Sequence, residues 1–228
     1  MSKPTMNPLT QLNESWAALQ SVIEAQSITL HKQIEFWAEN FGKVITPIAD
    51  IPLLKPLVNI PGLSWIAAAL GQVNLAAIAQ DIETLKDNQP EASQEQLAQK
   101  VIQEITLQAG GIGLATNLLP PIAVTLFAVD MAAIATLQVE LIYKIAAIYD
   151  YDIQEQNRRG EVLALYVCSA GSSTLIKSGL SFPEMLPIIG AIVGASSDAG
   201  ILWVIGQIAQ QYYKTKREHQ DTIVIDVQ

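Results

Sequence analysis

Residues 105–149 read ITLQAGGIGLATNLLPPIAVTLFAVDMAAIATLQVELIYKIAAIY, and this stretch decides the fold. Residues 105–129 carry no charged side chain, and only Asp130 interrupts the neutral run before Glu140. A bilayer core about 30 Å thick requires about 20 apolar helical residues. The stretch is therefore long enough to be embedded in a membrane.

Two features of this stretch oppose a single continuous helix. Gly110 and Gly111 add backbone freedom, whereas Pro120 and Pro121 lack a hydrogen-bond donor and crowd the preceding turn. Proline is favourable in the first turn of a helix. We therefore expect one helix to end at Gly110 and Gly111, and a longer helix to run from about Pro121 to Tyr149.

The composition limits the possible environments and partners. Of 228 residues, 50% are hydrophobic and 15% are charged, against about 25% charged residues in ordinary soluble domains. The net charge of −9 leaves no basic footprint for phosphate and argues against nucleic acid binding. A single cysteine, Cys168, excludes an internal disulfide framework and fits a reducing compartment. The N-terminal residues lack the pattern of a secretory signal peptide, so we expect a cytoplasmic protein.

Residues 9–41 have the spacing of a long amphipathic helix that Gly42 ends. One reading is that its apolar stripe packs against the rest of the same chain. The other is self-association, because near-heptad spacing over about four heptads can form a coiled-coil seam. The stripe consists of Leu12, Trp16, Leu19, Ile23, Gln26, Leu30, Ile34, Trp37 and Phe41.

Further helices are predicted on both sides of the central stretch. Four prolines make residues 43–63 an apolar hinge. Ser64 is a suitable N-cap for one helix over residues 64–88. Ser93 and Gln96 form a capping-box pattern for the next helix, and residues 153–169 form another.

The last apolar block begins near Pro183, and its Gly190-Ala-Ile-Val-Gly194 spacing permits close helix packing. The basic residues Lys214, Lys216 and Arg217 suit either a membrane flank or a helix C-terminus. The tail TIVIDVQ is interpreted as a short strand or as a disordered tip.

The sequence carries no recognisable catalytic constellation. With two histidines and one cysteine, no ordinary zinc site can be assembled. The serines lack the GxSxG pattern of a nucleophile elbow, and the glycine cluster lacks both the third glycine and the preceding strand of a dinucleotide site. We expect a protein that is not an enzyme and that has no metal or other cofactor.

Asp130 and Asp198 need an explanation, because an ionised carboxylate in apolar surroundings is costly. One reading is structural, with Asp130 bonded to a helix end or to Lys144 or Lys177. The other is a polar floor that positions a lipid head group or another amphiphile. Trp203 and several tyrosines fit interfacial anchors, although such rings also fill cores.

The segment AGGIGLATNLLPPIAVTLFAVDMAAIATLQVELIYKIAAIYDYD resembles the central motif of EcsC-like proteins. Asp130, Gln138 and Tyr149 stand at the motif's Asp, Gln and Tyr positions, and Asp150 replaces the motif's glycine. The block LPIIGAIVGASSDAGILWVIGQIAQQYY is similar to the family's C-terminal segment, in which Asn is frequent near the position of Asp198. The resemblance covers roughly residues 90–217 and implies an all-helical, membrane-linked bacterial protein with no established reaction.

Together these features predict an all-α, amphiphilic multi-helix bundle. We expect an N-terminal helix and hinge over residues 1–63, an EcsC-like helical domain over 64–218, and a tail over 219–228. The expected function is membrane association on the cytoplasmic side with self-assembly into homo-oligomers. The alternative is a soluble bundle that holds a lipid or another lipophilic small molecule in an apolar cavity. The candidate lipid-binding residues are Asp130, Gln138, Tyr149, Asp198 and Trp203.

Overall fold

The computed structural model describes residues 21, 24–25, 27–42, 63–117, 123–170 and 198–226. These residues are 86% helical and contain no strand, which confirms the all-α prediction. The proline-rich hinge and the Gly190–Gly194 spacing lie outside the described residues.

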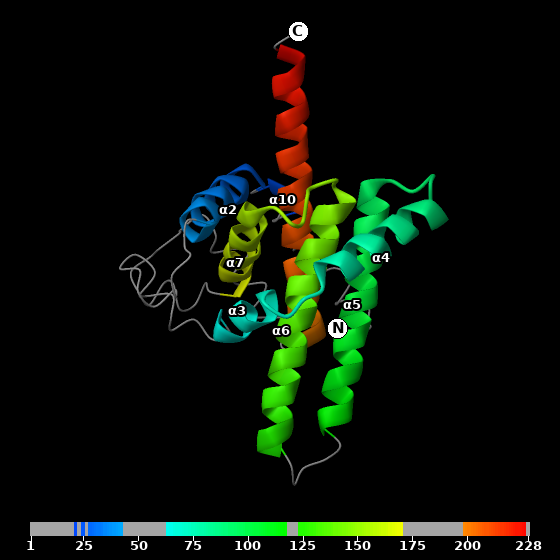
Figure 1. The fold of residues 1–228 in the computed structure, drawn as a ribbon, viewed down its shortest axis with the longest axis vertical. Helices are drawn as coiled ribbons and strands as arrows, with labels where there is room; N and C mark the ends of the chain where they lie inside the picture. Colours follow the sequence, from blue (N-terminus) through cyan, green and yellow to red (C-terminus); the bar gives the residue numbers. More distant parts are fainter. Residues whose placement is uncertain are drawn as a thin grey trace, which may run out of the picture.

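Three long helices form the frame of the molecule: α5 (Gln94–Asn117), α6 (Ala123–Ile148) and α10 (Asp198–Asp226). They pack against one another, with α5 antiparallel to the other two (Figure 1). A Cβ atom on Gly206 of α10 would lie 2.7 Å from Cγ1 of Ile102, so glycine is what allows α10 to approach α5 this closely. The core of the bundle is apolar and lies between these helices.

The prediction that a helix ends at Gly110 and Gly111 is wrong. Helix α5 continues through both glycines to Asn117. A glycine inside a helix costs about 1 kcal/mol relative to alanine, which is little beside the packing of α5 along α6 and α10. The described helix α6 begins at Ala123, close to the predicted start at Pro121.

The single helix predicted over residues 64–88 is also wrong. The chain forms α3 (Leu63–Leu70) and α4 (Leu75–Asn88), separated by a turn. The side chain of Asn74 accepts a 3.0 Å hydrogen bond from the backbone N–H of Ala77 and so caps α4. Ser64 lies inside α3 and does not precede it.

The C-terminal prediction fails because α10 runs on to Asp226, so residues 222–226 are helical and are neither a strand nor a disordered tip. Lys214, Lys216 and Arg217 consequently lie within α10, and not at its C-terminus. Each of them meets a carboxylate of another segment: Glu95, Glu161 and Asp150 respectively.

Two further helices, α2 (Ser27–Gly42) and α7 (Gln156–Ala170), pack against each other and against α10. Ile34 of the N-terminal stripe is fully buried, which confirms for this residue that the stripe packs on the same chain. The other stripe side chains lie outside the described residues. Helix α7 lies within three residues of its predicted start and one of its predicted end.

Two caps fix the ends of the frame helices. The Ser93–Gln96 capping box is confirmed, because the Ser93 N–H donates to Gln96 Oε1 (2.8 Å) and the Gln96 N–H donates to Ser93 Oγ (3.2 Å). At the end of α6, the N–H groups of Asp150 and Tyr151 donate to the carbonyls of Ala147 and Ala146, which is a Schellman motif.

Asp150 occupies the left-handed position of that motif, with φ of 64°. A left-handed backbone favours glycine. Aspartate tolerates the conformation because its short polar side chain can bond locally. Here its carboxylate also accepts hydrogen bonds from the side chains of Lys86 (2.7 Å) and Gln94 (2.8 Å). These bonds link α4 and α5 to the end of α6.

Candidate functional site

Within the described residues, the paired ends of α5 and α6 extend beyond the first residue of α10. Gly206 lies against Ile102 in an antiparallel pair, so the first residue of α10 is level with about residue 110 of α5. Helix α5 continues to Asn117, roughly 10 Å further at 1.5 Å per residue. Figure 1 shows this hairpin end extending past the beginning of α10, drawn in orange.

The hairpin end, defined here as residues 111–117 and 123–129, contains no charged residue. Just above it on α5, the side chain of Leu107 is 76% exposed. Helix α3 packs on α6 and is also uncharged, and Trp65 is exposed on it. Tryptophan is enriched at membrane–water interfaces. The described helices include none that is both long and apolar enough to cross a bilayer.

Asp130 and Asp198 come to the same level of the frame. Helices α6 and α10 run in parallel, and Tyr151 donates a hydrogen bond to Gln220 (3.3 Å) beyond the end of α6. The two residues in that contact are 69 positions apart in sequence. Because the two helices run in parallel, the same offset places Asp130 at about the same height along the frame as residue 199. Both aspartates therefore lie at the base of the hairpin end, although their side chains lie outside the described part of the chain.

The remaining candidate residues lie elsewhere. Gln138 is buried within α6, and Trp203 is a partly buried residue packed against the core. Tyr149 lies roughly 28 Å from Asp130 along the helix axis, too far for one small ligand to contact both. The structure therefore brings Asp130 and Asp198 to one level but does not gather the five residues into a single pocket.

Tyr149 nevertheless has an unusual hydroxyl. It is buried and has no hydrogen-bond partner among the described residues. Burial raises the pKa of this phenol, and the negative charges of Glu95 and Glu218 raise it further. The group therefore stays neutral at any physiological pH.

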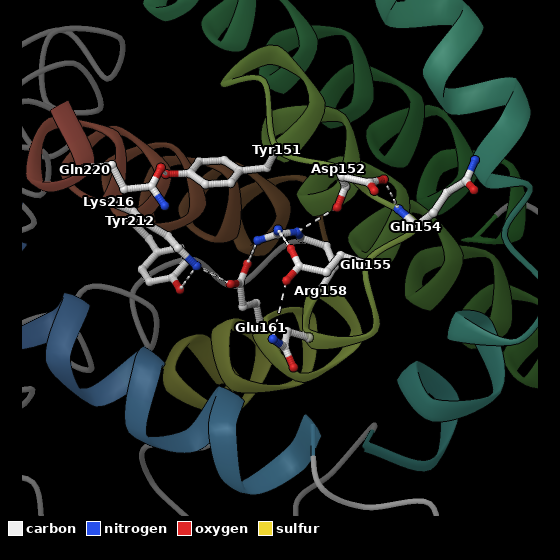
Figure 2. Close-up of polar contacts among 10 residues, drawn as sticks. Tyr151, Asp152, Gln154, Glu155, Arg158, Glu161, Tyr212, Lys216 and Gln220 are labelled. Carbon is white, nitrogen blue, oxygen red and sulfur yellow. Dashed lines mark hydrogen bonds and ion pairs between the residues drawn. The ribbon is translucent and has the colours of Figure 1, made fainter. Parts of the chain in front are cut away.

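A buried ionic network joins α7 to α10 (Figure 2). Arg158 and Glu161 of α7 are 2% and 3% exposed, and they form an ion pair. Arg158 also donates to Glu155 (2.6 Å) and to the carbonyl of Asp152 (3.2 Å), while Lys216 of α10 reaches the other oxygen of Glu161. Glu161 thus holds two cations from two helices.

Aromatic rings surround this network. The guanidinium of Arg158 lies 4.9 Å from the centre of the Tyr151 ring, and the ammonium of Lys216 lies 5.3 Å from the same ring. Cations are attracted to the faces of such rings. Burial would lower the pKa of Arg158, but the adjacent Glu161 raises it. Burial raises the pKa of Tyr213, which packs beside Tyr151.

The spacing of Arg158 and Glu161 as an i,i+3 pair is visible in the sequence and could have indicated this pair. No sequence signal indicates that Lys216, from a helix far along the chain, completes the network. The same is true of His31 of α2 and His219 of α10, whose rings stack with centres 5.3 Å apart.

Two open cavities accompany these features. A groove of about 540 Å³ lies between α5 and α10 and is lined mainly by glutamines, and Gln99 bonds both Gln207 (3.0 Å) and Gln210 (2.8 Å) across it. A cleft of about 510 Å³ is bordered by Glu35, Glu39, Asn157, Glu161, Tyr212, Lys216 and Ala38. Within the described part of the chain, no group of three or more His, Cys, Asp or Glu residues is placed to hold a metal ion.

Comparisons of the chain with protein-family models, with curated proteins and with solved structures find no match.

Proposed function

We propose that this protein is a membrane-associated helical protein without enzymatic activity, and that the hairpin end of α5 and α6 enters one leaflet of a bilayer from the cytoplasmic side. The observation that carries the proposal is that the uncharged ends of α5 and α6 extend about 10 Å beyond Asp198, the first described residue of α10. A leaflet's hydrocarbon layer is about 15 Å deep, half of the 30 Å core. The hairpin end fits within that depth.

Its composition also favours insertion. The hairpin end includes six Leu, Ile, Val and Phe residues, each worth about 0.3–0.6 kcal/mol in a membrane-inserted helix. The total is about 2–4 kcal/mol, from which the costs of Thr116, Asn117 and Thr125 are to be subtracted. A charged side chain costs about 2.5–3.5 kcal/mol at the centre of a membrane. Asp130 and Asp198 therefore set the depth at which insertion stops.

The EcsC-like resemblance supports the same role, since it implies an amphiphilic, membrane-linked protein. Self-assembly is the second part of the proposal. Ile28 and Phe36 of α2 are 61% and 54% exposed, so the N-terminal helix keeps apolar surface outward even where Ile34 packs inward. We propose that this helix joins copies of the chain into homo-oligomers.

The alternative of a lipophilic ligand in an interior cavity draws no support from the two cavities described above. Both are lined mainly by polar or charged side chains, whereas ligand pockets for apolar molecules are lined mainly by apolar ones.

Flotation of the purified protein with phosphatidylcholine vesicles tests the proposal. We expect the wild type to float with the vesicles and Phe127→Asp, which places a charge in the hairpin end, to bind about tenfold more weakly, because a charge costs about 2.5–3.5 kcal/mol at the centre of a membrane and less toward its surface. Ala79→Asp, at an exposed position of α4, adds the same charge away from the hairpin and should bind like the wild type. Circular dichroism confirms that both variants fold. A wild type that stays with the soluble fraction in every vesicle composition would refute the proposal.

A further inference from the structure

The two histidines of the chain, His31 of α2 and His219 of α10, meet where α2 packs against α10 (Figure 1). Their rings stack with centres 5.3 Å apart and with an angle of 4° between the planes. His31 is 8% exposed, and its ring also lies beside that of Tyr212, with centres 5.2 Å apart. Burial raises the pKa of Tyr212, so this phenol stays neutral. The histidine pair is therefore part of the contact by which α10 holds α2.

Each histidine has one nitrogen engaged and one left to protonate. Nδ1 of His219 lies 2.7 Å from the carbonyl oxygen of Thr215, and Nε2 of His31 lies 3.3 Å from a carboxylate oxygen of Glu35. Because both oxygens are hydrogen-bond acceptors, each of these nitrogens carries the hydrogen of a neutral ring. A further proton on each ring places two positive charges 5.3 Å apart.

The groups that face His31 come from α2 itself and from α7 and α10, the helices that pack against it. Burial lowers the pKa of His31, and the charges of His219 and Lys216 on α10 lower it further. The carboxylates of Glu35 on α2 and Glu161 on α7 act in the opposite direction and offset only part of the effect. The docked position of α2 therefore favours the neutral form of His31.

We propose that His31 and His219 form a pH-sensitive latch, which holds α2 against α7 and α10 while both rings are neutral and releases α2 when they are protonated. Histidine is the side chain whose charge ordinarily changes between pH 5 and 8. Protonation of histidine clusters is a known way to switch a packed interface. Release uncovers Ile34 and Ala38, which are 0% and 7% exposed in the docked helix. The latch does not depend on the proposed membrane function.

The size of the effect follows from proton linkage. In released α2, His31 is in water and has the ordinary pKa of about 6.5, so the released form binds a proton more readily than the docked form. For one such proton, the ratio of released to docked protein rises by up to about tenfold between pH 7.5 and pH 5.5. Repulsion within the protonated pair acts in the same direction.

Release of α2 can be measured by hydrogen exchange. A lone helix of about 12–15 residues is only marginally stable in water, and α2 has 16 residues. Once α2 leaves α7 and α10, its backbone hydrogen bonds open and its amide protons exchange with solvent. The protection of residues 27–42 against exchange therefore reports the docked fraction, and the protection of α5 in the same sample reports the frame.

The experiment is hydrogen–deuterium exchange of the full chain, followed by mass spectrometry, at about pH 7.5, 6.5 and 5.5. The rates are corrected for the pH dependence of chemical exchange. We expect the protection of α2 to fall by up to about tenfold over this range while that of α5 stays constant. His31→Phe keeps an aromatic ring beside His219 and should abolish the fall. His219→Phe removes the second charge and should make the fall smaller. Glu35→Gln is the control for carboxylate titration and should keep the fall.

Four results would overturn the inference. The first is that α2 keeps its protection at low pH. The second is that α2 and α5 lose protection together, which would show unfolding of the whole protein. The third is that the fall persists in His31→Phe, and the fourth is that it disappears in Glu35→Gln, because a carboxylate would then be the titrating group. If His31→Phe does not fold, His31→Gln replaces it with the same expected result.

Discussion

Removing the charge of Glu161 should destabilise the protein strongly. It is 3% exposed and holds Arg158, which is 2% exposed, together with Lys216 from α10. Glu161→Gln keeps the shape of the side chain and removes its charge. Arg158 then remains buried, with Glu155, a half-exposed residue at the surface, as its one remaining carboxylate.

The expected magnitude follows from the burial of the pair. Removing one partner of a buried ion pair costs about 3–5 kcal/mol, because the other charge stays buried without compensation. For a chain of 228 residues, 1 kcal/mol shifts the melting temperature by about 2–4 °C. Glu161→Gln should therefore lower the melting temperature by about 6–20 °C, measured by circular dichroism or calorimetry.

Glu155→Gln is the matched control, since it removes the other carboxylate that Arg158 contacts. That carboxylate is 49% exposed, and exposed ion pairs contribute about 0–1 kcal/mol. We expect a shift of a few degrees at most. If the two variants melt at the same temperature, or if Glu161→Gln melts with the wild type, the network does not stabilise the junction of α7 and α10.

Three further predictions follow from single side chains. Burial lowers the pKa of His31 in the folded protein, so this histidine binds a proton more readily in the unfolded chain, where its pKa is about 6.5. The free energy of unfolding should therefore fall as the pH drops below about 6.5. In chemical denaturation, His31→Phe should make that fall smaller. Gly206→Ala drives a methyl group into the buried Ile102 side chain and should cost about 1–3 kcal/mol, whereas Gly71→Ala meets only ordinary contacts and should lie within about 0.5 kcal/mol of the wild type. Tyr149→Phe removes a buried hydroxyl that has no hydrogen-bond partner among the described residues. The variant should raise the unfolding free energy by about 1 kcal/mol and leave vesicle binding unchanged. A loss of binding would show that the hydroxyl contacts lipid.

Local chemistry explains the parts of the fold that the sequence predicts well. The Ser93–Gln96 box depends on residues near one another in the chain. One error arises where packing outweighs local preference: Gly110 and Gly111 stay helical within α5, which packs along α6. The other error is local, because the cap of α4 is Asn74, directly before that helix, and not Ser64.

In the candidate site, too, the sequence predicts which residues matter but not how distant parts of the chain come together. Asp130 and Asp198 attract notice in the sequence because each is a carboxylate within a long apolar run. Their common level could not be predicted, because it depends on the register between α6 and α10. Contacts far along the chain fix that register, among them the hydrogen bond from Tyr151 to Gln220 and the approach of Arg217 to Asp150, with 4.0 Å between nitrogen and oxygen.

The register contacts of α10 lie away from the uncharged hairpin end. The contacts between α5 and α10 lie on the N-terminal side of residue 110 in α5. They are the ion pair of Glu95 with Lys214, the hydrogen bond of Gln99 with Gln207, and the packing of Ile102 on Gly206. The charged half of the frame therefore supplies the specific contacts that hold the three helices together. These contacts between α5 and α10 lie outside the hairpin end, which is the part that the proposed function brings to a bilayer. A variant that loosens these contacts, such as Gly206→Ala, should therefore destabilise the fold and alter vesicle binding together, whereas Phe127→Asp should alter binding alone.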